Sequence, residues 1–358
     1  MSLDLTPVAE ARRQMEICNA CRYCEGFCAV FPAMTRQKAF ADGDLTQLAN
    51  LCHNCGACYY ACQYTAPHEF ALNIPAALAE VRADSWERLA RPQALARLFQ
   101  RHGVAMAGLM ILALAAFFWA LAALRPEAGD GFYAHLAHDA MVAIFAPAFI
   151  LPLVLIALSV RDYWREVGGG RITLAHLRAA LSSAARMKNL SGGHGEGCNF
   201  EEGDRFTNRR RLYHQAVMYG FLLCFASTAS GTVMHYALGW QAPYPLLSLP
   251  KLLGLPGGAL MVVGAAGLAV LKLRADRALG AARVWGGEMA FVLLLGWVAL
   301  TGLVLYAATG SALVAPLLAI HLASVMVLFL LMPFSKMVHG FYRLAALLAE
   351  AGKPAPVG

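Results

Sequence analysis

The chain has 358 residues, of which 59% are hydrophobic and only 14% are charged. A soluble globular domain carries about 25% charged residues, so the composition excludes an ordinary soluble enzyme and also a disordered, collagen-like or disulfide-stapled secreted chain. The formal net charge of +7 would suggest nucleic-acid binding on a soluble protein. Here the basic residues are interpreted as signals of membrane topology, because they flank the apolar segments, and we expect no nucleic-acid partner.

The first 101 residues contain eight of the ten cysteines, in two runs of identical spacing, C-x2-C-x2-C-x3-C. Four thiolates are what a [4Fe–4S] cluster needs, and in two-cluster ferredoxins the fourth cysteine of each run ligates the other cluster. We therefore expect two [4Fe–4S] clusters. The expected ligand sets are Cys18, Cys21 and Cys24 with Cys62, and Cys52, Cys55 and Cys58 with Cys28.

Structural zinc is the rival interpretation of these cysteines, but it needs only two C-x2-C pairs and leaves the third and fourth cysteine of each run unexplained. Disulfides are not expected in a cytoplasmic segment. The proline that often follows the fourth cysteine is replaced by Ala29 and Gln63, which changes the local turn and not the number of ligands.

The segment between the two runs lacks strand-like alternation, and residues 75–100 show the spacing of a helix with one buried face. These patterns favour a helical ferredoxin-like domain over the β-rich bacterial type. No cleavable signal peptide is visible before it.

Six later segments are long and apolar enough to cross a bilayer, so the predicted fold class is an all-α membrane protein with a helical dicluster ferredoxin-like domain followed by six transmembrane helices. The fourth segment is interrupted by glycines, which often mark close helix contact in membranes. The expected spans are residues 103–124, 140–160, 212–238, 252–271, 289–308 and 312–334. The expected divisions are 1–101 (iron–sulfur domain), 102–160 (two spans), 161–211 (Gly/Arg-rich loop), 212–345 (a four-helix, cytochrome b-like bundle) and 346–358 (tail).

Positive charge predicts the orientation. With both termini and the iron–sulfur domain in the cytoplasm of a bacterium, 27 of the 29 Lys and Arg residues lie inside and only Arg125 and Lys251 lie outside. We therefore expect a multi-pass protein of the inner membrane.

The 161–211 loop contains a glycine-rich stretch, 191–198, that lacks the preceding strand and the spacing of a dinucleotide fingerprint. We expect it to contact a partner or the adjacent cytoplasmic domain. Cys198 is interpreted as an unpaired loop thiol, and Cys224 as a small hydrophobic residue in lipid.

Four histidines lie on or near the ends of predicted spans, and polar residues in a bilayer point to function. His321 and His339 are 18 residues apart, and His214 and His235 are 21 apart, so each pair extends over about 27–31 Å of helix. Since the third and sixth spans run in opposite directions, His214 and His339 are expected at the cytoplasmic surface and His235 and His321 at the outer one.

One facing pair at each membrane surface, His214 with His339 and His235 with His321, is what two bis-histidine b-type haems would require, and a single pair would hold one haem. The alternative for any one membrane histidine is a hydrogen-bonded packing or proton-relay residue. His135 and His138 are expected at the outer surface, and His53 and His68 are expected to tune or pack around a cluster.

Five segments resemble the tricarballylate/citrate-utilisation protein B family (TcuB, also called CitB), and the resemblance covers nearly the whole chain. The chain is also similar to the membrane half of the cofactor-biosynthesis protein CobZ, and its last span is similar to the cytochrome b subunit of nitrate reductases. The segments are 21–32 (CRYCEGFCAVFP), 51–63 (LCHNCGACYYACQ), 67–70 (PHEF), 239–249 (GWQAPYPLLSL) and 338–343 (VHGFYR).

The resemblance implies an electron-transfer protein that reoxidises the reduced FAD of a separate tricarballylate dehydrogenase and passes electrons through iron–sulfur clusters and haem to membrane quinone. It also leaves open a CobZ-like role in corrin biosynthesis. A heterodisulfide-reductase-like enzyme is a further alternative, for which Cys198 is the only cytoplasmic cysteine left over. No flavin or nicotinamide fingerprint is present in the sequence, so a partner is expected to handle the organic substrate.

Overall fold

The structure, a computed structural model, describes residues 6–124, 135–192 and 195–353. Within these ranges the elements are helices, accompanied by two isolated β-bridges, Cys198–Thr207 and Glu201–Ala275. The predicted all-α fold class is confirmed. Arg125, part of the glycine-rich stretch (193–194) and the end of the predicted tail (354–358) lie outside the described residues.

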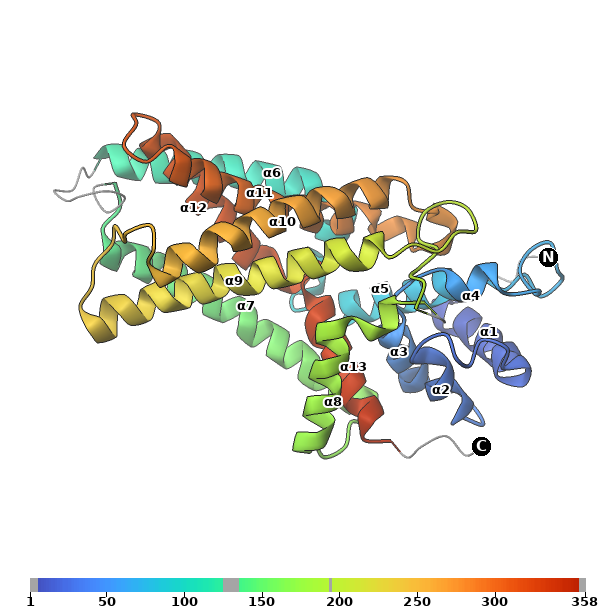
Figure 1. Cartoon of the computed structure of the whole chain (residues 1–358). Helices are drawn as coiled ribbons and strands as arrows, with labels where there is room; N and C mark the ends of the chain where they lie inside the picture. The colour runs from blue at the N-terminus through green and yellow to red at the C-terminus, as the bar shows by residue number, and fades with distance from the viewer. Residues whose placement is uncertain (1–5, 125–134, 193–194, 354–358) are drawn as a thin grey trace.

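The N-terminal module is a group of short helices at one end of the molecule (Figure 1). Its helices are α1 (Pro7–Cys21), α2 (Val30–Thr35), α3 (Asp42–Leu51), α4 (Ala57–Tyr60) and α5 (Ile74–Leu89). The prediction of a single helix over residues 75–100 is wrong in one respect. α5 ends at Leu89 and the next helix begins at Gln93, because Pro92 between them has no N–H to continue the helical hydrogen bonds.

Six long helices form the membrane bundle, and all six are long and apolar enough to cross a membrane, as predicted. They run roughly along the long axis of the molecule, so the bundle has a module-side end and a far end (Figure 1). The helices are α6 (Gln93–Leu124, kinked at His102), α7 (His138–Glu166), α9 (Arg209–Leu238), α10 (Leu249–Leu273), α11 (Trp285–Ala307) and α12 (Val314–Leu331).

The glycines of the fourth span bring α9 and α10 into backbone contact. A Cβ on Gly257 would lie 2.9 Å from the carbonyl oxygen of Gly220, and a Cβ on Gly264 would lie 2.7 Å from that of Tyr213. Small residues allow such close approach between membrane helices. The interruptions that weaken this span as a sequence signal are therefore its packing surface.

One hydrophobic core joins the module to the bundle. The module-side part of α7 and the C-terminal helix α13 (Val338–Ala351) pack into the same cluster of buried residues as α1, α2, α3 and α5. Tyr163 of α7 donates a hydrogen bond to Gln47 of α3 (2.8 Å), and Gln47 donates to the carbonyl of Ala346 in α13 (2.8 Å). This buried polar chain ties three elements that are distant in sequence.

Two expected boundaries differ from the structure. The segment 161–211, expected as a loop, contains the end of α7 and a further helix, α8 (Leu174–Arg186), which packs against α13 (Figure 1). The tail expected from residue 346 begins inside α13, which continues to Ala351. Both helices are amphipathic and gain their stability from packing, which a search for long apolar runs does not detect.

Candidate functional site

The first cysteine run follows the end of α1. Cys18 and Cys21 lie on its last turn, which ends where Arg22 takes a left-handed φ of 58° and donates its backbone N–H to the Cys18 carbonyl (2.8 Å). Cys24 and Cys28 follow on tight turns, and Cys21 is exposed. The first run therefore reaches the surface of the module.

The second cysteine run lies deeper. Cys52 ends α3, and the chain then turns through Gly56, whose φ is 77°, before Cys58 on α4 and Cys62 after it. A Cβ on Gly56 would lie 2.5 Å from the carbonyl oxygen of Asn199. Only glycine readily adopts this left-handed φ and also leaves room for the Asn199 carbonyl at this distance.

The fourth cysteine of each run lies with the other run. Cys28 lines one small cavity together with Cys52, Cys55 and Cys58. Cys62 is in turn an electrostatic neighbour of Cys18 and Cys24. The structure thus groups the thiols in the two crossed sets that the spacing leads us to expect.

The pKa values of the grouped thiols are raised because the thiols are buried close to one another. Burial and the neighbouring Cys62 raise the pKa of Cys18 and of Cys24 to about 12. Burial, with Cys55 nearby in both cases, raises the pKa of Cys28 and Cys58 well above the usual range. Several buried thiolates are stable together only beside positive charge such as iron supplies, so the residues present fit a metal cluster.

In the described ranges, no three His, Cys, Asp or Glu side chains converge as the ligands of a single ion must. A cluster does not need such convergence on one point, because a four-iron cluster presents a separate iron to each of its four cysteines. The cysteines need only surround a common volume, as they do around the cavity of the second set.

Three arginines from distant elements hold the second run. Arg82 of α5 and Arg343 of α13 both donate to the Cys52 carbonyl, at 3.0 and 2.8 Å. Arg210 of α9 donates to the Asn54 carbonyl at 2.7 Å. Burial, together with the nearby Arg82, lowers the pKa of Arg343 to about 9. The run nearest the bundle is therefore surrounded by positive charge.

The loop before α9 also closes over the second run. The backbone N–H of Asn199 donates to the Cys55 carbonyl at 2.7 Å, so this part of the expected loop does contact the neighbouring domain. Cys198 beside it is only 2% exposed, and burial raises the pKa of its thiol. Such a cysteine is poorly placed to be a reductase nucleophile, which disfavours the heterodisulfide-reductase-like alternative.

Two of the four predicted membrane histidines meet at the module-side end of the bundle. The rings of His214 (α9) and His339 (α13) have centroids 5.7 Å apart and are nearly perpendicular. The Nδ1 atom of His214 is buried without a hydrogen-bond partner. Burial, with His214 nearby, holds the pKa of His339 well below its ordinary value, so its imidazole is neutral, the form that binds haem iron.

His53, next to Cys52, lies beside this pair. Burial, together with the neighbouring Arg343, Arg210 and His214, holds its pKa well below the ordinary value. The sequence linked His53 only to the cysteines. Its proximity to His214 depends on α9 reaching the module, which local spacing does not reveal.

The expected pairing at the far end is not what the structure shows. His235 stacks on His138, with ring centroids 4.1 Å apart, and His138 also hydrogen-bonds Tyr236 (2.9 Å). His321 instead faces α11, where it hydrogen-bonds Thr301 at 3.1 Å and lies close to Gly302. His138, expected as a surface residue, is therefore the neighbour of His235, and His321 is not brought to that site.

Comparison with known proteins identifies the family of the chain. The family model described as citrate utilization protein B matches residues 88–356, and its Fer4-like domain matches residues 11–87. The chain is 45% identical over 351 residues to citrate utilization protein B of Escherichia coli, covering 96% of this chain and 92% of that protein. The chain belongs to the citrate utilization protein B family. No solved structure matches it.

For this member of the citrate utilization protein B family, the matched Fer4-like domain coincides with the N-terminal module, and it indicates that the module binds iron and sulfur. The remaining match covers the six long helices and α13. The family boundary at residue 87 falls close to the end of α5 at Leu89.

Proposed function

We propose that this protein transfers electrons in citrate or tricarboxylate utilisation: it reoxidises the reduced FAD of a tricarballylate-type dehydrogenase and passes the electrons to membrane quinone. The observation that carries the proposal is the junction of module and bundle. There His53 and the second cysteine set of the matched Fer4-like domain lie near His214, whose ring packs against that of His339 at the end of the bundle.

The eight cysteines would hold two [4Fe–4S] clusters, each of which supplies a one-electron carrier when bound. The first set presents the exposed Cys21, and the adjacent Tyr23 is 71% exposed. The second set lies inward, and its loop carbonyls are held by Arg82, Arg210 and Arg343. This order of exposure supports entry of electrons at the first set, where a flavoprotein partner can dock, and transfer inward to the second.

His214 and His339, whose rings meet at the module-side end, would hold one haem b there, and the haem would supply a further one-electron carrier. At the far end the stacked rings of His138 and His235 are too close and too parallel to leave an iron between them, and His321 is directed to α11. The geometry therefore gives less support to a second haem held by His235 and His321.

The distribution of charge supports placing the module and both termini on the cytoplasmic side of a bacterial inner membrane. Nearly all Lys and Arg residues lie in the segments at the module-side end of the bundle or in the module itself, as the positive-inside rule requires.

The test uses the purified full chain and the reduced flavoprotein of its genetic neighbourhood under anaerobic conditions. We expect flavin absorbance to recover with the wild-type protein and to stay bleached with Cys21→Ser. The matched control is Cys224→Ser, because Cys224 lies on α9 outside both cysteine sets. Equal recovery with Cys21→Ser would refute the cysteine route, and a wild-type protein that never reoxidises the flavin would refute the proposed function. Adjacent corrin-ring genes in place of a dehydrogenase gene would favour the CobZ-like role.

A further inference from the structure

Two cavities lie along α6, α10 and α11, one at the module-side ends of these helices and the other about one helical turn further along them. The first has a volume of about 460 Å³ and a partly polar lining that includes Arg101, Lys272 and Trp285. The second, of about 620 Å³, is a lateral groove between the same three helices, and its lining is almost wholly apolar. Helical rise places the groove about 3–5 Å further along each helix, for example from Arg101 to Val104 on α6.

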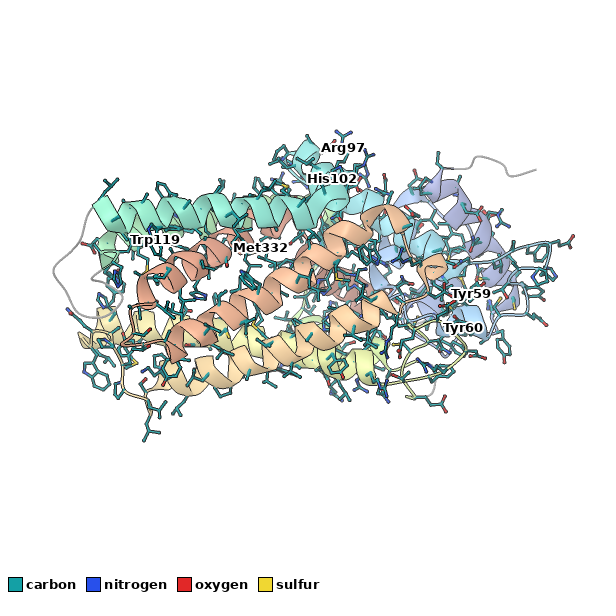
Figure 2. The ribbon with its side chains drawn as sticks, turned by 90° about the horizontal axis from the view of Figure 1, so that it is seen from above. Tyr59, Tyr60, Arg97, His102, Trp119 and Met332 are labelled. Atoms are coloured by element: carbon teal, nitrogen blue, oxygen red, sulfur yellow. The ribbon has the colours of Figure 1, made fainter. Side chains whose placement is uncertain are left out.

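Figure 2 places the kinked end of α6, marked by Arg97 and His102, at the module-side end, and Trp119 of the same helix toward the far end. The polar cavity lies beside the kink, because Gln100 and Arg101 contribute to its lining. A polar chamber with an apolar groove about one helical turn away suits an amphiphile with a compact polar head and a long apolar tail.

The unpartnered atoms of the polar cavity are neutral hydrogen-bonding groups. The indole N–H of Trp285 and the side-chain oxygen of Asn54 are both buried without a hydrogen-bond partner, and both residues line the cavity. A buried polar atom left unpaired costs about 1–3 kcal/mol. A head group whose oxygen is a carbonyl when oxidised can accept from Trp285, and the hydroxyl that it carries when reduced can donate to Asn54.

Most of the cations around the cavity are already engaged. Lys336 binds Glu288 at 2.7 Å, and Lys272 binds the other oxygen of the same carboxylate. Arg283 binds Glu80 and Glu87 at 2.9 and 2.6 Å. Arg82 donates to the Cys52 carbonyl. Arg101 and Arg277 also line the cavity, so a head group would meet positive charge as well as the neutral atoms of Trp285 and Asn54, and the binding test must separate a quinone from an anionic lipid.

The polar cavity also touches the redox-active part of the module. Asn54 lies between Cys52 and Cys55 in the chain, and it lines both this cavity and the small cavity of the second cysteine set. A head group bound here would be separated from that set by a single loop.

From this geometry we infer that the two cavities form a quinone site, with the head ring beside Trp285 and Asn54 and the isoprenoid tail in the groove of α6, α10 and α11. The inference rests on the proposed function and names its acceptor site. The quinone gains two electrons and two protons and leaves as the quinol, with an O–H bond formed at each carbonyl oxygen. The partner's reduced flavin loses two electrons and two protons, so the exchange balances.

The experiment measures equilibrium binding of decylubiquinone to the purified, oxidised full chain in phosphatidylcholine nanodiscs. Trp285→Phe removes one donor and is expected to raise Kd about 3- to 10-fold. Ala266→Phe fills the groove from an exposed position on α10 and is expected to raise Kd about 10-fold by displacing tail carbons. Trp119→Phe and Val263→Phe are the matched controls. Both are exposed positions outside the two cavities, and both are expected to keep the wild-type Kd.

Unchanged Kd values in both test variants, with the proteins folded, would overturn the site. So would tight co-purification of anionic phospholipid that Ala266→Phe abolishes while quinone binding persists, since the groove would then be a lipid site. The result is separable from the proposed function. If the protein fails to reoxidise the flavoprotein, the binding of quinone to the oxidised protein can still be measured. If the quinone site is refuted, electron transfer from the flavoprotein to the cysteine-bound clusters can still be tested without quinone.

Discussion

Replacement of Tyr163 by Phe tests whether the module and the bundle are held together by their shared core. The Tyr163 ring is 0% exposed, and its hydroxyl donates to Gln47, which is 2% exposed. The variant keeps the ring but leaves the Gln47 side-chain oxygen buried without this donor. A buried acceptor left unpaired costs about 1–3 kcal/mol, so the junction should open about 5- to 150-fold more often.

Native-state proteolysis in mild detergent measures that opening, because the cleavage rate follows the population of the open form when opening and closing are fast. We expect Tyr163→Phe to be cut faster at the junction by the factor above. Tyr23→Phe is the control, since Tyr23 is 71% exposed and surface changes usually stay within about 0.5 kcal/mol. A cleavage rate for Tyr163→Phe within twofold of the wild type would refute the reasoning that this hydrogen bond secures the junction.

Three further outcomes are expected. Gly257→Ala should lower the melting temperature of the purified protein by several degrees, because the new Cβ would meet the Gly220 carbonyl at 2.9 Å. Gly108→Ala is the control and should not lower it, because the space around its Cβ is open. Equal melting curves for the two variants would contradict this prediction. Cys62→Ser should remove the electron paramagnetic resonance signal of the first cluster and Cys28→Ser that of the second, and the opposite assignment would show that the sets are not crossed. His339→Ala should lose the module-side haem by pyridine haemochrome assay, and unchanged haem content would remove this residue as a ligand.

The number and type of the long helices could be predicted because crossing a bilayer needs a long apolar run, which is a local property of sequence. The crossed grouping of cysteines could be anticipated for a similar reason, since the x2 spacing recurs in known two-cluster proteins. α8 and α13 are different. Each is an amphipathic helix that packs against the other, and α13 also packs into the core of the module, and no run of residues encodes these contacts.

The histidines show the same limit at the site. Spacing along a helix gives the height of His235 and His321 in the membrane, and both do lie in the far half of their helices. Height does not say which neighbour a side chain faces. His321 turns toward Thr301 on α11 and His235 toward His138 on α7, and that choice depends on the order in which the helices pack. Likewise, Trp285 and Asn54 share a cavity although 231 positions separate them.

The common core of module and bundle has a consequence for how redox partners must approach. Some electron carriers hang on a tether and travel between donor and acceptor, so their turnover slows as the solvent becomes more viscous. In this protein α7 and α13 are built into the core of the cysteine-bearing module, which leaves it no hinge on which to swing. For the proposed electron transfer, the distances inside the chain would then be fixed by the fold, and the proposed flavoprotein and quinone would be the components that diffuse.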